Sequence, residues 1–564
     1  MRLLGLFFLI FNIGLSQNKY PKDYFGSPLD IPLSISGFFG DLRPNHFHSG
    51  IDFKTQKKEG FPVYATADGF ISRIKISTSG YGKVIYIDHP NGYTTVYGHL
   101  QSYETAIQKI VIAEQYAKNS YDIEMYPKPN EILVKKGDVI GYSGNTGGSD
   151  GPHLHYEIRD TKTENIINPL FFGYDSSFLD TKAPQVIGLL AYSIGTTSQV
   201  NGTSNPVFVP LSLQKDGSYL ATTITATGKI AFGLNAFDTS DNSWNKNGIY
   251  KLETFLNGTP YYGYEFDAFS FDETKYINTF IDYKRYKSQK QRFQKLFVSY
   301  LYPKNIIKML KNEGFVDVTS NFTLNYKIVL HDFHGNKSTI NIPISYGLIM
   351  PLEKPDNENK TPYFLKAKNE NNYTKDGISV FIPENTFYDD FYLNFEVKDN
   401  ELFLHDDSVA VNDYMTITFD VAKIPVPERE KMFIANLDGE KTEYNSTYKK
   451  DSIFSTRTKK LGKFFLTKDE TPPLIYKPNF SEGENLDNQP ILKIYISDDL
   501  SGIATYNAYL NEKWILMEYE NKLNRLTHNL SDAIFENGKN EFKLIVTDKL
   551  GNSATFESNF NKTK

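Results

Sequence analysis

Cysteine is absent from this chain of 564 residues. Without thiols, no disulfide forms and no cysteine is available for a lipid anchor, so any metal site must be built from histidine and carboxylate side chains. Long blocks of lysine and arginine are also missing, and the formal net charge is -6. The sequence therefore has no electrostatic footprint for nucleic acid, which we exclude as a partner.

Long apolar runs are missing beyond the N-terminus, and a bilayer span needs ~20 such residues, so we expect no transmembrane segment in the mature chain. The N-terminus itself has Met1 and Arg2 followed by an apolar run, Leu3 to Leu15, broken only by Asn12. This pattern is typical of a signal peptide covering residues 1–16. We expect an exported protein in the periplasm or at the cell surface of a bacterium; a membrane anchor is the alternative, disfavoured by the short run.

Hydrophobic residues make up 40% and charged residues 23% of the chain, as in globular proteins. The length predicts several domains: a catalytic domain at 17–174, a β-sandwich module with an insertion at 180–346, a middle β domain at 361–468 and a C-terminal sandwich at 469–564. Short β-type runs separated by turns predict a mainly β fold. Within the first domain we predict a hairpin turn at Pro90 to Gly92 and a helix at Tyr103 to Lys118.

An internal repeat organises the C-terminal two thirds of the sequence. The segment DTKAPQVI at 180–187 matches DETPPLI at 469–475, and YKIVLHDFHGNKST at 326–339 matches FKLIVTDKLGNSAT at 542–555. Two copies of one Ig-like β-sandwich fit this pattern best, with an insertion in the first copy around Tyr261 to Asn312. Acidic turns in both copies most often cap strands; calcium binding is the alternative. Through these modules we expect protein or cell-wall partners.

Six of the ten histidines lie between positions 46 and 155. The segment HFHSGID places His48 and Asp52 four residues apart, and GPHLHYEIR places His153 and His155 two apart. Catalytic zinc takes three protein ligands and keeps one position open. We predict that His48, Asp52 and His155 are these ligands.

The local geometry of these segments sets two requirements. An extended chain would hold His48 and Asp52 about 13 Å apart at ~3.3 Å per residue, so the chain must bend at Ser49 and Gly50. His153 and His155 share one face of a predicted strand with Glu157 and Arg159, which we interpret as a local ion pair. We assign ligation to His155 and chemistry to His153, and His99 in YGHL is the best candidate to share the acid-base or oxyanion role.

The order HxxxD, then VYGHL, then KKGDVIGYSGNTGGSDGPHLHYEIR resembles the lysostaphin/LytM-type zinc metalloendopeptidases over roughly residues 32–170. The resemblance implies a LytM-like β-sheet domain with zinc bound by His48, Asp52 and His155 and with catalytic His99 and His153. It also implies hydrolysis of peptide cross-links in bacterial peptidoglycan by a zinc-activated water with histidine acid/base assistance. An insertion after Leu100 departs from the family pattern and alters the expected shape of the substrate groove.

Two other functions are compatible with the sequence. One is an inactive scaffold of the same fold that regulates another hydrolase, which the presence of every ligand disfavours. The other is a zinc peptidase that acts on an exported protein. His46 is expected at the surface or in support of a ligand, and His89 is expected to be solvated in the hairpin turn. Structural roles are expected for the remaining four histidines: His331, His334, His405 and His528.

Overall fold

The computed structural model describes residues 20–563 except 242, 320–322, 348–359 and 533–534. The predicted signal peptide at 1–16 lies outside the described residues. Strands far outnumber helices, which confirms a mainly β fold. No helix in the described part of the chain is both long and apolar enough to cross a membrane. We name four regions after the boundaries predicted from the sequence: the N-terminal region (20–174), the second region (180–346), the third region (361–468) and the fourth region (469–563).

The N-terminal region is built on a twisted sheet whose main path runs in the order β1-β4-β13-β8-β7-β6-β10. Its strands β7 and β8 pair antiparallel around residues 89–92, which confirms the predicted hairpin. Three further strands, β5, β12 and β9, form a small second sheet. The bounds along the main path are Ile35–Gly37 (β1), Ile51–Lys54 (β4), His153–Asp160 (β13), Tyr93–Leu100 (β8), Lys83–Asp88 (β7), Gly69–Ile76 (β6) and Ile123–Met125 (β10); the second sheet has Pro62–Tyr64 (β5), Val139–Tyr142 (β12) and Ser102–Tyr103 (β9).

One helix, α1 (Thr105–Lys118), interrupts this region where the sequence predicts it. The Glu104 side chain accepts a hydrogen bond from the Ala106 N–H, and the helix ends at Asn119 in the left-handed conformation. Its buried residues recur every four positions, so one face packs on the sheet: Ile107, Val111 and Gln115.

The second region is a twelve-stranded sheet with long antiparallel strands. Its main strands are β15 (Gln185–Val200), β19 (Ile224–Phe237), β20 (Lys251–Leu256), β21 (Thr259–Glu265), β26 (Leu324–His331) and β27 (Lys337–Tyr346). The predicted insertion holds this region's three described α-helices: α2 (Phe271–Thr274), α3 (Ile277–Phe280) and α4 (Tyr283–Gln289). Within it, β22 (Ala268–Phe269) pairs with β14 (Ile166–Ile167) of the N-terminal region. The insertion thereby extends the N-terminal sheet and holds α2 beside it.

The third and fourth regions each have two larger sheets and their own hydrophobic core. The third region pairs β29-β30-β34-β38-β37 and β32-β33-β39-β35-β36; the bounds are Asn371–Lys375 (β29), Ile378–Ile382 (β30), Met415–Asp420 (β34), Ile453–Thr458 (β38), Tyr448–Lys450 (β37), Phe395–Lys398 (β32), Glu401–Leu404 (β33), Gly462–Lys468 (β39), Met432–Asp438 (β35) and Lys441–Tyr444 (β36). The fourth region pairs β40-β42-β46-β45 and β41-β48-β47-β43-β44; the bounds are Leu474–Tyr476 (β40), Ile491–Ser497 (β42), Arg525–Asn529 (β46), Glu518–Glu520 (β45), Glu484–Asn485 (β41), Ser553–Lys562 (β48), Gly538–Asp548 (β47), Ile503–Leu510 (β43) and Lys513–Ile515 (β44). The Ig-like character of the modules stays a prediction.

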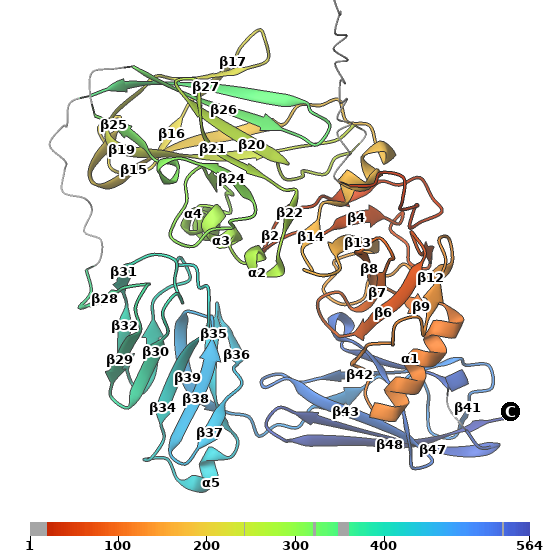
Figure 1. Cartoon of the computed structure of the whole chain (residues 1–564). Coiled ribbons are helices and arrows are strands. Elements are labelled where there is room, and N and C mark those ends of the chain that lie inside the picture. Colours follow the sequence, from red (N-terminus) through yellow and green to blue (C-terminus); the bar gives the residue numbers. More distant parts are fainter. Residues whose placement is uncertain (1–19, 242, 320–322, 348–359, 533–534, 564) are drawn as a thin grey trace, which may run out of the picture.

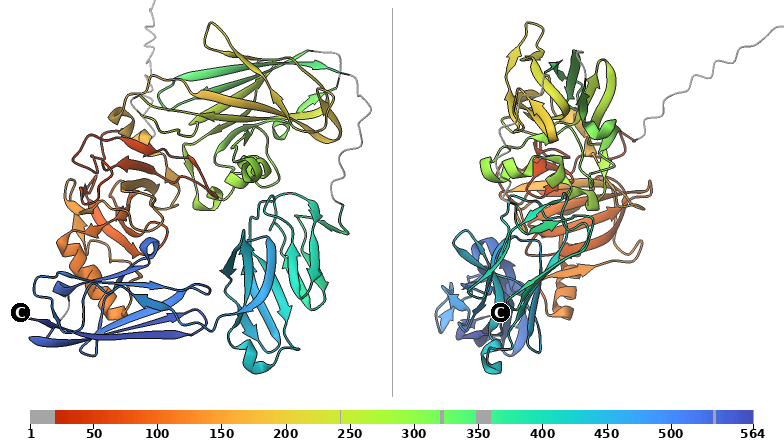
Figure 2. Two further views of the ribbon diagram at one scale, coloured as in Figure 1. Left: turned by 180° about the vertical axis from the view of Figure 1, so that it is seen from behind. Right: turned by 90° about the vertical axis from the view of Figure 1, so that its left-hand side faces the viewer.

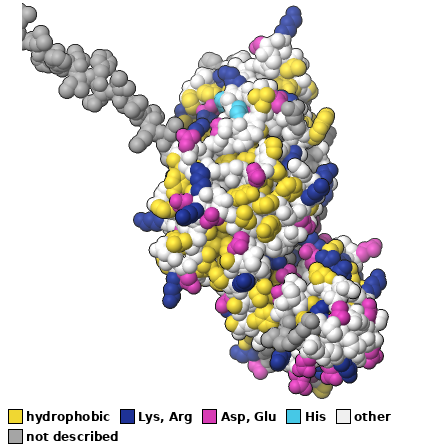
Figure 3. Space-filling view, turned by 90° about the vertical axis from the view of Figure 1, so that its right-hand side faces the viewer, with side chains coloured by type: hydrophobic (Ala, Val, Ile, Leu, Met, Phe, Trp, Pro, Cys, Tyr) yellow, Lys and Arg dark blue, Asp and Glu magenta, His cyan; other side chains and the backbone are white. Residues whose placement is uncertain are grey.

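The chain curves round so that the fourth region returns to the N-terminal region beside α1 (Figures 1 and 2). The rings of Tyr116 and Trp514 meet edge to face at 5.4 Å between centroids, and Lys83 Nζ lies 2.8 Å from Glu518 Oε2. Leu516 is buried in the core of the N-terminal region. On the face drawn in Figure 3, basic and acidic side chains are interspersed.

Candidate metal centre and its cleft

Three neighbouring strands position the predicted site. In the sheet, β13 lies between β4 and β8, and His155 of β13 is the direct partner of Asp52 on β4 and of Gly98 on β8. Side chains of directly opposed residues in antiparallel strands have Cβ atoms only about 4.5–5.5 Å apart. The register therefore brings Asp52 next to His155 and sets His99, one residue after Gly98, at the same end of the sheet.

His48 reaches the same point because the chain bends where the sequence predicts a bend. Residues 48–50 leave β3 (His46–Phe47) and turn into β4. A Cβ atom on Gly50 would lie 2.4 Å from the Tyr156 carbonyl oxygen and 3.0 Å from His155 Cε1. Only glycine lets the bend pass this close to β13, which is how His48 arrives opposite His155.

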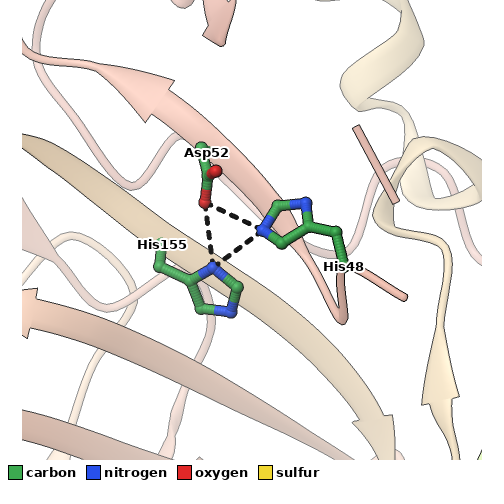
Figure 4. Close-up of side chains that lie close together, drawn as sticks. All are labelled: His48, Asp52 and His155. Carbon is green, nitrogen blue, oxygen red and sulfur yellow. Dashed lines mark hydrogen bonds and ion pairs between the residues drawn. The ribbon is translucent and has the colours of Figure 1, made fainter. Parts of the chain in front are cut away.

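Three donor atoms form a small triangle (Figure 4). His48 Nε2 lies 3.0 Å from Asp52 Oδ1 and 3.2 Å from His155 Nδ1, and the third side, His155 Nδ1 to Asp52 Oδ1, is 2.9 Å. Ligands held about 2.0–2.2 Å from a tetrahedral zinc are roughly 3.3–3.6 Å apart. The triangle is within a few tenths of an ångström of that spacing, so these residues suit one metal ion.

Hydrogen bonds on the far side of each ligand leave its metal-facing atom free to bind. The Nδ1 of His48 donates to the Phe38 carbonyl at 2.8 Å, so Nε2 carries the lone pair. The Nε2 of His155 contacts Glu157 Oε1 at 2.9 Å, which leaves the lone pair on Nδ1. Arg43 Nη2 donates to Asp52 Oδ2 at 2.9 Å while Oδ1 faces the imidazoles. Such outer partners fix the orientation and tautomer of metal ligands, and all three donors fit a zinc ion.

The charge distribution of the site also favours a cation. Although burial opposes it, the neighbouring imidazoles of His48, His153 and His155 hold the pKa of Asp52 well below its usual range. Burial would likewise lower the pKa of His155, yet hydrogen bonds to Asp52 and Glu157 raise it to about 9. The triangle therefore combines an ionised carboxylate with an imidazole whose second carboxylate partner stabilises positive charge.

The two other histidines of the prediction lie beside the triangle. His153 Nε2 is 3.5 Å from Asp52 Oδ1, and its Nδ1 donates to the Gly151 carbonyl at 2.8 Å. His99 Nδ1 donates to the Thr146 carbonyl at 2.8 Å, and the His99 and His153 ring centroids are 4.8 Å apart. Both imidazoles thus have Nδ1 engaged and Nε2 available as a proton acceptor.

His99 has a strained backbone conformation and a buried side chain. Its φ is 58°, in the left-handed region, which costs a non-glycine residue about 1–3 kcal/mol. Burial, followed by the neighbouring His155 and His153, lowers the pKa of His99 to about 3. His99 therefore remains neutral, and because its Nδ1–H is held by the Thr146 carbonyl, Nε2 is available as a hydrogen-bond acceptor in the cleft.

These residues line a cleft of about 760 Å³. One wall comes from the second region, where Phe271 and Thr274 of α2 face the cleft beside Arg43. The guanidinium carbon of Arg159 lies 4.5 Å from the centroid of the Phe271 ring. The insertion predicted in the sandwich module therefore shapes the groove, together with the N-terminal region.

The structure thus brings all five predicted site residues into one cleft: His48, Asp52, His99, His153 and His155. His46 lines the cleft outside the triangle, and its exposed side chain hydrogen-bonds to the Pro44 carbonyl. The expectation that His89 is solvated is wrong. Its ring is buried and contacts the Asp68 carbonyl and Thr95 Oγ1, both at 2.8 Å, because it closes the hairpin against the core.

Of the contacts that support the ligands, the sequence predicted only the Glu157–Arg159 ion pair. The predicted Glu157–Arg159 ion pair is present, with Arg159 Nε donating to Glu157 Oε2 at 2.7 Å. The same carboxylate also contacts His155, Ser49 and Tyr81 through Oε1. The alternation of β13 places Glu157 on the face of His155, which was a usable signal. Nothing local in the sequence marks Tyr81 or Phe38.

Residues 46–117 and 112–169 match Peptidase family M23, and residues 362–469 match a Zu5-like domain. The chain contains a peptidase family M23 domain. The Zu5-like match covers the stretch where the sequence predicts a middle β domain.

Among curated proteins, the chain is 38% identical over 112 residues to the DD-carboxypeptidase/endopeptidase Mpg of Neisseria meningitidis, covering 20% of each chain. It is 33% identical over 143 residues to the peptidoglycan DD-endopeptidase ShyA of Vibrio cholerae, covering 23% of this chain and 26% of ShyA. The chain thus spans about a quarter or less of the length of these relatives. A solved structure of the catalytic domain of the M23 protein EnpA from Enterococcus faecalis is 26% identical, with a TM-score of 0.19, over 27% of this chain and 97% of EnpA.

Proposed function

We propose that the chain is an exported zinc metalloendopeptidase that hydrolyses the peptide cross-links of bacterial peptidoglycan. The observation that carries the proposal is the triangle of His48, Asp52 and His155 in an open cleft, with two further imidazoles beside it. The names of the relatives support peptidoglycan as the substrate, because ShyA is named a peptidoglycan DD-endopeptidase and Mpg a DD-carboxypeptidase/endopeptidase.

The proposed division of labour follows from the hydrogen bonds. Zinc bound in the triangle would supply Lewis-acid polarisation of a carbonyl and make a water molecule acidic enough to attack near neutral pH. His153 Nε2, 3.5 Å from Asp52 Oδ1, is placed to accept a proton from the attacking water. His99 shares this acid-base role as the second hydrogen-bond acceptor, which orients the attacking water through Nε2, since its Nδ1 is held by Thr146.

The same contacts explain why these imidazoles hold their positions. The Nδ1 of His153 donates to the Gly151 carbonyl, and the Nδ1 of His99 donates to the Thr146 carbonyl. Backbone anchors of this kind fix the ring plane and the tautomer, so Nε2 enters the cleft without reorganisation. Pre-organised groups of this type supply about 10²–10⁴-fold in rate as general acids or bases.

The proposal is tested by digesting defined, D,D-cross-linked muropeptide dimers and identifying the products by mass spectrometry. Wild type is expected to release monomers. His48→Ala should lose both zinc and product, while His153→Ala should keep zinc and lose about 100-fold or more in turnover.

His46→Ala is the matched control, because His46 lines the cleft outside the triangle. It should keep zinc and most of the turnover. Loss of zinc in His153→Ala would contradict the assigned roles. A zinc-loaded wild type that leaves every cross-linked dimer intact would refute the proposed substrate.

A further inference from the structure

Three aspartates of the second region meet at its junction with the N-terminal region. Asp180 lies just before β15, Asp238 directly follows β19, and Asp332 directly follows β26. These residues are 7%, 8% and 2% exposed. One carboxylate oxygen from each lies within 4.8 Å of the others. The fold therefore gathers three acidic groups from distant parts of the module in a buried place.

No described lysine or arginine forms an ion pair with any of the three carboxylates; the nearest pair, Lys182 Nζ to Asp241 Oδ1 at 4.0 Å, uses another aspartate. Burying like charges without a counter-charge is strongly unfavourable. The cluster therefore needs neutralisation from protons or from a bound cation.

Unpartnered polar atoms point to a bound ligand. Among the described residues, Asp238 Oδ1 and both side-chain polar atoms of Asn247 are buried without a hydrogen-bond partner. Asp238 and Asn247 face each other across an antiparallel bridge with backbone bonds of 2.9 Å in both directions. Both side chains, with Asp180, line a small cavity of about 20 Å³, and buried polar groups normally find a partner.

We propose that Asp180, Asp238 and Asp332, with the Asn247 amide oxygen, bind a calcium ion. Calcium takes carboxylate and amide oxygens at 2.3–2.6 Å, so two oxygens on one ion are at most roughly 4.6–5.2 Å apart. The separation of up to 4.8 Å meets that limit. The cavity lined by Asp180, Asp238 and Asn247, about 20 Å³, exceeds the roughly 10–15 Å³ that one water-sized occupant needs. Asp332 does not line it, but one of its carboxylate oxygens lies within 4.8 Å of those of Asp180 and Asp238. The donor set contains oxygens and no thiolate, which favours calcium over zinc.

The second copy of the sequence repeat has the same arrangement. Asp469, Asp498 and Asp548 also bring one carboxylate oxygen each within 4.8 Å. In the first copy, Asn336 donates through its backbone N–H to Asp332 Oδ1 at 2.8 Å and through Nδ2 to Asp332 Oδ2 at 2.7 Å. Asn552 does the same to Asp548 at 2.9 and 2.7 Å. The acidic cluster is therefore a property of the repeated module.

The position of the first cluster connects it to the metal centre. Phe38 lines the same cavity as Asp180 and Asp238, and its carbonyl accepts the hydrogen bond from His48 Nδ1. Asp41, which accepts from the Phe38 N–H at 2.9 Å, also accepts from Gly248 N–H at 2.6 Å. Calcium in this cavity would fix the position of residues 38–41, which orient His48. It would also hold the second region, whose Phe271 lines the cleft, against the N-terminal region.

The test is calcium titration of the full chain by isothermal calorimetry after removal of bound ions with EGTA, followed by melting curves with and without calcium. Wild type is expected to bind calcium with a dissociation constant below about 1 mM, the weak limit for extracellular sites, and to melt several degrees higher with calcium. Asp238→Asn should lose one equivalent of calcium and the corresponding rise in melting temperature.

Asp216→Asn is the matched control, since Asp216 caps an exposed turn of the same region through Ser218. It should keep the wild-type stoichiometry. If Asp238→Asn fails to fold, Asn247→Ala is used instead, because the Asn247 side chain makes no described hydrogen bond that the change would remove. Asn247→Ala should weaken calcium binding about tenfold, since it removes one of the six to eight oxygen ligands of the ion. Repeating the titration in His48→Ala, which lacks the zinc ligand, should leave the calcium count unchanged and so separates this proposal from the proposed function.

A wild type that binds no calcium would overturn the proposal. So would an Asp238→Asn protein that folds and binds as much calcium as wild type, or an Asn247→Ala protein with unchanged affinity.

Discussion

Replacing Glu157 with glutamine tests how the metal centre is supported. Glu157 is fully buried on β13, and its carboxylate accepts hydrogen bonds from His155, Ser49 and Tyr81 on one oxygen. The other oxygen accepts from Arg159. Although burial alone would raise it, the charges of Arg159 and His155 hold the pKa of Glu157 far below its usual value. Glutamine has nearly the same shape as glutamate. It has only one acceptor oxygen, however, and its NH₂ group would face some of the four groups that donate to Glu157.

Two separate losses follow from this geometry. The guanidinium of Arg159, with 5% of its side chain exposed, loses its only described ion-pair partner, and breaking a buried pair costs about 3–5 kcal/mol of unfolding free energy. His155 loses a charged acceptor at Nε2, and loss of such an outer partner weakens metal binding about 10–100-fold. At about 1.4 kcal/mol per tenfold, that corresponds to roughly 1.4–2.8 kcal/mol of zinc affinity.

The assay measures zinc affinity by chelator competition and stability by urea unfolding, in wild type, Glu157→Gln and Glu124→Gln. Glu124 is the matched control because it pairs with Arg73 on the same sheet and is partly exposed, so its loss should cost at most about 1 kcal/mol and leave zinc binding unchanged. If Glu157→Gln unfolds more easily yet binds zinc as tightly as wild type, Glu157 is only an ion-pair partner and this reasoning is wrong.

Three further outcomes are expected. Phe271→Ala should raise KM about fivefold, from roughly 1 kcal/mol of lost apolar contact, with zinc content unchanged in metal analysis; an unchanged KM for every cross-linked substrate would exclude α2 from the groove. Gly50→Ala should destabilise the fold by about 1–3 kcal/mol in urea unfolding, since its Cβ would meet the Tyr156 carbonyl at 2.4 Å, whereas Gly151→Ala, with open space around its Cβ, should unfold like wild type. Removal of zinc with a chelator should abolish muropeptide cleavage and added zinc should restore it; cleavage that survives chelation would exclude a metal from the chemistry.

Much of the site could be predicted because its residues lie in short motifs. The spacing of His48 and Asp52 and the strand alternation of His153 and His155 are local patterns, and local patterns largely determine which face of a strand a side chain occupies. The bend at Gly50 could be predicted because an extended chain would hold His48 and Asp52 too far apart to bind one metal ion. Strand order could not be read in the same way, yet it decides that Asp52 is the cross-strand partner of His155.

The remaining parts depend on contacts between segments far apart in the sequence. Phe38 follows β1, and Arg43 lies in the short strand β2 (Leu42–Arg43). Both orient the ligands, but nothing in the composition of residues 38–43 predicts this role. Phe271 enters the cleft from an insertion that the repeat located, but its packing on the N-terminal sheet depends on the pairing of β22 with β14. His89 was misplaced for a related reason, because a turn residue is buried when the core lies beneath the turn.

The most direct measurement is an anomalous difference map, recorded at the zinc absorption edge from crystals of the zinc-loaded chain. We expect one peak about 2.0–2.2 Å from each of His48 Nε2, Asp52 Oδ1 and His155 Nδ1. A map with no peak inside this triangle, or with zinc bound at another group of residues, would contradict the account.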